Sequence, residues 1–75
     1  MILAIVVCGS FQEYEDFLKE RGVLSREYRY ARRPEDLFGL RGVDVFMWGR
    51  YWENPLYASG EIDLKIALGD LKLQN

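Results

Sequence analysis

Ile2-Leu-Ala-Ile-Val-Val-Cys8, followed at once by Gly9-Ser10, is the stretch of sequence that decides the fold. Its apolar run shows no alternation with polar side chains, which is typical of a strand that is covered on both faces and lies in the middle of a parallel sheet. Ser10 and Glu13 have the Ser-x-x-Glu spacing of a helix-capping box, and Gly22 is suited to end the helix that they begin. The stretch predicts a central strand that runs directly into a helix.

The rest of the chain predicts two more strands and one more helix. Arg26 to Arg33 alternates in period two, as a half-exposed edge strand does, and Pro34 to Phe38 has the composition of a single helical turn. Val43 to Trp48 is apolar enough for a third strand. The last element is predicted as a helix from about Ser59 to Leu71, with a tail that frays after Asp70.

This order of elements, β-α-β-β-α, predicts a small three-stranded parallel α/β sheet of Rossmann-like type that occupies residues 1–75 as a single domain. With the fully apolar strand in the middle, the strand order is 2-1-3. The third strand then has an exposed edge, and one face of the sheet is covered only by the Pro34 to Phe38 turn. Either surface is a natural place for a second copy of the chain to dock.

Composition narrows the chemistry that is available. The chain has 75 residues, no histidine and one cysteine, Cys8, which excludes an intrachain disulfide, histidine-dependent catalysis and the usual Cys/His metal sites. We therefore predict neither a metal nor a cofactor and assign no catalytic residue. The first apolar run is too short to span a bilayer, so we expect no membrane association and a cytoplasmic protein.

Most of the ten basic residues lie between Lys19 and Arg50, although the net charge is −2. In an open parallel sheet, ligands bind beside the carboxyl ends of the strands where the strand order reverses. Gly9, Ser10, Arg32 and Arg50 follow the predicted strands at that end, so we predict that they bind an anion such as a nucleotide. The same residues also have simpler interpretations, because Ser10 caps a helix without any ligand and Arg32 keeps an edge strand soluble.

Aromatic residues are the second group of candidates. Phe46, Trp48, Tyr51 and Trp52 surround the end of the third strand, and adjacent large aromatic side chains in a loop need a surface to pack against. A partner chain and a bound ligand each explain them. We predict that these four residues form an interface and that the chain is a homo-oligomer.

Three segments, Ile5 to Ser10, Pro34 to Gly42 and Val43 to Pro55, together resemble the small uncharacterised Rossmann-like proteins of bacteriophages of actinobacteria. This resemblance implies a viral protein that is made in the cytoplasm of an infected host cell and serves there as a host-interaction or accessory protein. More distantly, the strand-turn-helix start and Ser59-Gly60-Glu61-Ile62-Asp63 are similar to nucleoside 2-deoxyribosyltransferase-like domains. That resemblance implies a carboxylate nucleophile at Glu61 or Asp63.

Three functions remain open from the sequence. The first is a binding module, homo-oligomeric and without chemistry of its own, that takes a host protein or a nucleotide-like anion. The alternative is an N-glycosidic hydrolase or transferase acting on nucleosides or nucleotides. The third is salt-dependent binding of DNA or RNA through Arg26, Arg29, Arg32 and Arg33.

Overall fold

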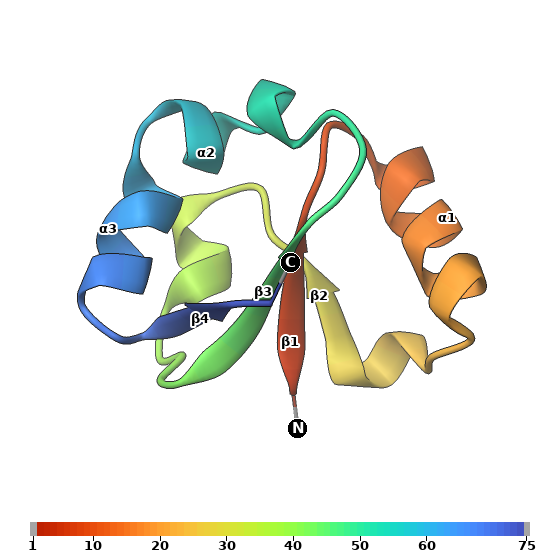
Figure 1. Cartoon of the computed structure of the whole chain (residues 1–75), viewed down its shortest axis with the longest axis horizontal. Coiled ribbons are helices and arrows are strands. Elements are labelled where there is room, and N and C mark those ends of the chain that lie inside the picture. The colour runs from red at the N-terminus through yellow and green to blue at the C-terminus, as the bar shows by residue number, and fades with distance from the viewer. Residues whose placement is uncertain (1, 75) are drawn as a thin grey trace.

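The computed structural model describes residues 2–74, which form a four-stranded parallel sheet with helices on both sides (Figure 1). Its strands are β1 (Ala4–Val7), β2 (Tyr28–Tyr30), β3 (Val43–Met47) and β4 (Leu71–Leu73). They pair in the order β2-β1-β3-β4, and every neighbouring pair is parallel. The predicted α/β class and the 2-1-3 order of the first three strands are confirmed, whereas the prediction of only three strands is wrong.

The first strand leads into α1 (Phe11–Arg21), as its capping signals predict. Ser10 has an extended backbone, and its hydroxyl oxygen accepts from the Glu13 N–H at 3.3 Å. Gly22 ends the helix in the left-handed conformation at φ 64°, and its N–H donates to the carbonyl oxygens of Leu18 and Lys19. The helix therefore covers the residues between the two signals read from the sequence.

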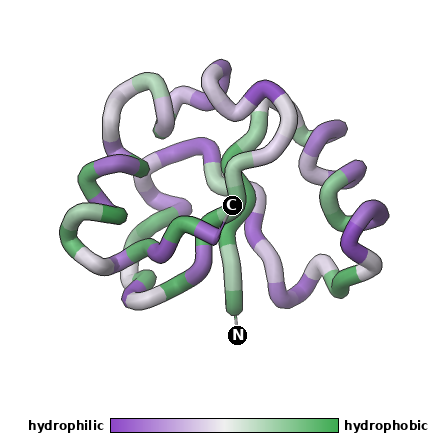
Figure 2. The backbone as a smooth tube through the Cα atoms, viewed as in Figure 1, coloured by the Kyte–Doolittle hydropathy of each residue, from purple (hydrophilic) through white to green (hydrophobic). Residues whose placement is uncertain are grey.

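β1 is the centre of the molecule because both of its faces are buried. Ala4, Val6 and Cys8 face α1, where they pack with Tyr14, Phe17 and Phe46. Ile5 and Val7 face the other side, where they pack with Val45, Leu56 and Ile62. In Figure 2 the trace of β1 is hydrophobic along its length, in agreement with a strand that never meets water.

The face opposite α1 is covered by three short elements together (Figure 1). These are the 3₁₀ turn η2 (Pro34–Leu37), α2 (Pro55–Ala58) and α3 (Glu61–Ala67), which bury Leu37, Leu56 and Ile62 respectively. The expectation that a single helical turn covers this face is therefore wrong. Two of the three elements follow β3: α2 begins in the segment that the sequence suggested as a loop, and α3 lies within the predicted last helix.

β4 replaces the end of the predicted last helix. α3 stops at Ala67, and Leu71, which the helical interpretation placed in the helix, lies in β4 with 2% of its surface exposed. Gly69 has φ 83°, and the Asp70 N–H donates to the Lys65 carbonyl oxygen at 3.0 Å, which closes the helix and turns the chain back to the sheet. As a result β4 covers the edge of β3, and the predicted exposed edge of the third strand does not exist.

Candidate functional site

Three of the four predicted ligand-binding residues gather at the carboxyl ends of β1 and β3. Gly9 and Ser10 connect β1 to α1, and Arg50 follows β3 next to Gly49. Between them lies the point where the strand order reverses, which is where this kind of sheet usually holds a ligand. The fourth residue, Arg32, lies beyond β2 and belongs to a separate pocket.

The Glu13 carboxylate occupies the space between Gly9 and Arg50. Its Oε1 accepts from the Gly9 N–H at 2.7 Å and from the Arg50 N–H at 3.0 Å, and its Oε2 lies 3.2 Å from the same Arg50 nitrogen. The predicted capping box is therefore only half formed, because Glu13 reaches past the Ser10 N–H to bond Gly9. Backbone amides arranged as an anion cradle bind the chain's own carboxylate.

Gly49 makes this arrangement possible. It has φ 56°, and a Cβ built at this position lies 2.5 Å from the Glu13 Cδ. Any larger residue would displace the carboxylate from the amides. The guanidinium group of Arg50 takes no part in the cradle and lies 3.7 Å from the Glu53 carboxylate on the surface.

Asn54 is buried at the same end of the sheet, next to the ends of β1 and β2. The residue follows the 3₁₀ turn η3 (Tyr51–Glu53) and has none of its surface exposed. Its Nδ2 donates to the Cys8 carbonyl oxygen at 3.0 Å and to the Ala31 carbonyl oxygen at 2.8 Å, while its Oδ1 accepts from the Leu56 N–H at 2.9 Å. One side chain thus donates to the carbonyl groups just after β1 and β2 and also caps α2.

Only part of the role of Asn54 is visible in the sequence. Asn followed by Pro is a recognisable helix start, because Asn is a good N-cap and Pro suits the first helical position. That signal predicts the bond to Leu56. The bonds to Cys8 and Ala31 join segments that are distant in the chain, so no local pattern contains them.

Cys8 is buried at the end of β1, and its thiol is unreactive. Its Sγ lies 3.3 Å from the Ser10 carbonyl oxygen, to which it donates. Burial raises the pKa of Cys8 to about 11, with the Ser10 hydrogen bond opposing this and Glu13 adding to it. The thiol is protonated at neutral pH and is not a nucleophile.

A pocket of about 390 Å³ at the carboxyl end of β2 is lined by Tyr30, Arg32, Arg33 and Asp36. Asp36 Oδ2 accepts from the backbone N–H groups of Arg32 and Arg33, both at 2.9 Å. Burial raises the pKa of Asp36, but these two hydrogen bonds and the Arg33 and Arg29 guanidinium groups outweigh it and leave the pKa below its ordinary value. Asp36 is therefore ionised at neutral pH.

Tyr30, which lines this pocket, contacts two aromatic rings of α1. Tyr30 stacks on Tyr14 with ring centroids 5.7 Å apart, and Phe11 lies 6.0 Å from Tyr30. Burial is the main cause that raises the pKa of Tyr30. Its hydroxyl is therefore protonated at neutral pH and is able to donate a hydrogen bond.

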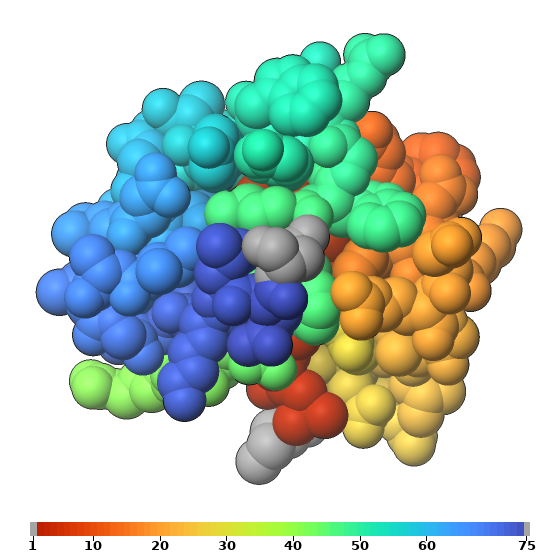
Figure 3. All heavy atoms as spheres, viewed as in Figure 1, coloured from red at the N-terminus to blue at the C-terminus, as the bar shows by residue number. Residues whose placement is uncertain are grey.

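The predicted interface residues have different surroundings. Phe46 and Trp48 lie on the α1 face, with ring centroids 5.3 Å and 5.5 Å from that of Phe17. Tyr51 packs edge-to-face on Tyr57 at 5.1 Å. Trp52 touches Tyr51 at 5.3 Å and has 56% of its surface exposed, in a segment that stands out at the top of the molecule in Figure 3. Within the chain, Trp52 is the most exposed of the four.

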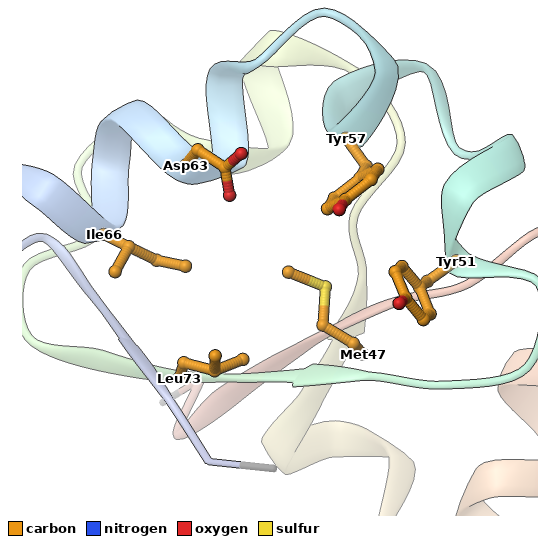
Figure 4. A pocket seen from close by; sticks show the side chains of 6 residues that line it. All are labelled: Met47, Tyr51, Tyr57, Asp63, Ile66 and Leu73. Carbon is orange, nitrogen blue, oxygen red and sulfur yellow. The ribbon is translucent and has the colours of Figure 1, made fainter.

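A second pocket, of about 380 Å³, lies between the sheet and the segment that contains α2 and α3 (Figure 4). It is lined by Met47, Tyr51, Tyr57, Asp63, Ile66 and Leu73. Asp63 is one of the two acids that the deoxyribosyltransferase resemblance implied as a nucleophile. The other, Glu61, is not among the lining residues.

Between residues 2 and 74, no helix combines the length and apolar composition that crossing a bilayer requires. The same part of the chain contains no group of three or more acidic or cysteine side chains placed to hold a metal ion. Comparison of the chain with models of known protein families, with curated proteins and with solved structures gave no match in any of the three.

Proposed function

We propose that the chain is a small binding module that takes an anionic, nucleotide-like ligand in the pocket of Tyr30, Arg32, Arg33 and Asp36. The observation that carries this proposal is that the Arg32 side chain is in none of the ion pairs of the described residues, although the Asp36 carboxylate lines the same pocket. That carboxylate already accepts from two backbone amides, so it leaves the guanidinium available to a ligand.

Arg33 strengthens the positive character of the pocket. Its guanidinium lies 3.8 Å from the Glu35 carboxylate, and both side chains are mostly exposed. An exposed pair of this kind contributes little stability, so a phosphate group can replace the Glu35 carboxylate at low cost. Two guanidinium groups with planar, forked donors suit the bidentate recognition of phosphate.

Tyr30 and the neighbouring ring of Phe11 offer a surface for the uncharged part of the ligand. Phe11 has 57% of its surface exposed, and its ring is next to that of Tyr30, which lines the pocket. A nucleobase stacks favourably on exposed aromatic rings of this kind. The pocket volume of about 390 Å³ also falls within the usual range for small-ligand sites.

The strand order β2-β1-β3-β4 supports a Rossmann-like assignment, because it matches the beginning of the flavodoxin-like order.

Binding of adenosine monophosphate, adenosine and inorganic phosphate, measured by calorimetry at low salt, tests the proposal. We expect the nucleotide to bind better than either part, and Arg32→Gln to weaken it about tenfold, as loss of a charged hydrogen bond predicts. Arg26→Gln is the matched control, because Arg26 is an exposed arginine in the turn before β2 and lies outside the pocket lining. Absence of nucleotide binding, or equal losses in both variants, would contradict the proposal.

The N-glycosidic alternative stays a prediction, and the positions of Asp63 and Glu61 make it testable with two variants. Asp63 lines the second pocket, whereas Glu61 does not. If the chain cleaves nucleosides through Asp63, Asp63→Asn abolishes base release and Glu61→Gln leaves it unchanged. Chromatography of nucleosides after incubation with the wild-type chain measures this, and no detectable release would exclude the alternative.

A further inference from the structure

The second pocket carries an inference that is independent of the nucleotide site. It lies where β3 and β4 end, under α2 and α3, and its lining comes from four separate parts of the chain (Figure 4). Met47 is the last residue of β3, and Leu73 is the last residue of β4. Tyr51 and Tyr57 come from the η3-α2 segment, and Asp63 comes from α3. None of its lining residues is shared with the arginine pocket beside β2.

Asp63 is the one charged group among the residues that line this pocket. Its carboxylate points into the hollow (Figure 4) and belongs to none of the ion pairs found in the described part of the chain. The nearest lysine in sequence, Lys65, is paired with Asp70 at 3.9 Å. The negative charge of Asp63 is therefore available to a ligand.

The two tyrosines add cation-attracting groups to this charge. Their rings are nearly perpendicular, with an interplanar angle of 86° and centroids 5.1 Å apart. Their hydroxyl groups lie on the side of the hollow (Figure 4). The tyrosine hydroxyl oxygens and the Asp63 carboxylate therefore present partial and full negative charge to an ammonium group in the hollow.

Met47, Ile66 and Leu73 make the remainder of the pocket apolar. Leu73 is about half exposed, so the apolar wall reaches the surface of the molecule. Such a wall favours carbon substituents, while the lining offers no positive charge to an anion. It also offers no N–H side-chain donor to a nucleobase, since tyrosine hydroxyls are the only side-chain donors that its residue types supply when Asp63 is ionised.

We propose that the pocket of Met47, Tyr51, Tyr57, Asp63, Ile66 and Leu73 binds an organic cation: an ammonium group that carries apolar substituents. Asp63 balances the charge, the hydroxyl oxygens of the two tyrosines face the ammonium group, and the apolar residues contact its carbon substituents. A nucleoside is the competing occupant, and the experiment below separates the two.

The test uses choline, its neutral carbon isostere dimethylbutanol, and uridine as probes. Carbon-13-labelled methionine gives two methyl NMR signals, because the chain contains only Met1 and Met47, and Met47→Leu identifies the signal from the pocket. Tryptophan fluorescence is an independent readout, since Trp52 touches Tyr51. We expect choline to shift the Met47 signal and dimethylbutanol to bind more weakly.

Two acidic variants make the test specific. Asp63 is exposed, so Asp63→Asn preserves the fold, and we expect it to weaken choline about fivefold with no change for the neutral probe. Glu61→Gln removes the same charge from the same helix outside the pocket and should leave choline binding unchanged. Equal binding of choline and dimethylbutanol, equal effects of the two variants, absence of choline binding, or preferential binding of uridine would each overturn the proposal.

Discussion

Asn54 and Glu13 are the two side chains that close the crevice at the carboxyl ends of β1 and β3. Asn54 bonds the carbonyl groups of Cys8 and Ala31, and Glu13 bonds the amides of Gly9 and Arg50. A ligand would use the same carbonyl and amide groups in a related sheet. Because the chain satisfies them itself, the open pockets lie on either side of the crevice, one beyond β2 and one beyond β3 and β4.

Replacing Asn54 tests how much this closure stabilises the fold. Asn54→Ala leaves two buried carbonyl oxygens without their donor and removes the cap of α2, so we expect a loss of about 3 kcal/mol in unfolding free energy. Asn54→Ser keeps a capping oxygen and should recover about 1 kcal/mol of that loss. Urea denaturation measures both. If Asn54→Ala lowers the unfolding free energy by less than an ordinary exposed substitution does, water has taken the place of the Asn54 amide.

Gly49 offers a test of the Glu13 cradle with an internal control. Gly49→Ala and Gly22→Ala both place a side chain at positive φ, at 56° and 64°, but only the first meets a neighbour, the Glu13 carboxyl group. Left-handed strain costs each variant about 1 to 2 kcal/mol, and the clash should add about 1 kcal/mol at Gly49.

Combining Gly49→Ala with Glu13→Ala completes a double-mutant cycle between Gly49 and Glu13. We expect the extra cost of Gly49→Ala over Gly22→Ala to disappear when the carboxylate is absent, because the remaining strain is the same at both glycines. Thermal or urea unfolding of the four variants measures the coupling. An extra cost that persists without the carboxylate would mean that Glu13 is not its source.

At the scale of elements, the features that the sequence predicts are ones whose signal is local. The apolar β1, the capped α1 and the turn at Pro34 all follow from neighbouring residues. β4 does not, because Leu64, Leu68 and Leu71 are spaced like one face of a helix and the segment is too short to show strand alternation. Gly69 contained the missing information, since glycine just after a helix ends it in the left-handed conformation.

Three leucines separate the helical interpretation from the observed strand. Leu68 and Leu73 are 63% and 48% exposed, whereas Leu71 is 2% exposed. We expect Leu71→Ala to cost about 2 to 4 kcal/mol of unfolding free energy, and both other alanine variants to cost less than 1 kcal/mol. A helix that continued through Leu71 would instead give Leu68 and Leu71 similar costs in urea denaturation.

The predicted anion site shows the same division between local and distant information. The strand ends correctly bring Gly9 and Arg50 together, because their positions follow from the topology. That Glu13 fills the space between them depends on a contact across 37 residues with Gly49 and Arg50. Arg32 lies apart from the other three because β2 ends at Tyr30, one strand away from the reversal point.

On the scale of the whole molecule, charge is separated along the carboxyl edge of the sheet. The pocket beyond β2 contains two arginines and one acid, whereas the pocket beyond β3 and β4 contains a single acid and no basic residue. The neutral plug of Asn54 lies between the ends of β1 and β2. Ligands of opposite charge are therefore expected to compete little with each other.

Self-association is also a property of the whole molecule, and it remains a prediction. With β4 on the edge of β3, and Phe46 and Trp48 packed on Phe17, Trp52 is the predicted interface residue with the largest exposed fraction. We expect light scattering to give a mass above that of one chain and Trp52→Ser to lower it. Phe38→Ser, at another exposed aromatic residue, should not. A monomer at high concentration would refute the prediction.

The position of Asn54 has a consequence for the order of folding events. Its partners Cys8 and Ala31 lie 46 and 23 residues away along the chain, so its bonds form only after β1, β2 and the segment after β3 have assembled. Contacts that appear after the rate-limiting barrier influence unfolding and leave the folding rate nearly unchanged. We expect the Asn54 bonds to form after that barrier, so that Asn54→Ala shortens the lifetime of the native state without slowing its formation. Refolding and unfolding rates measure this.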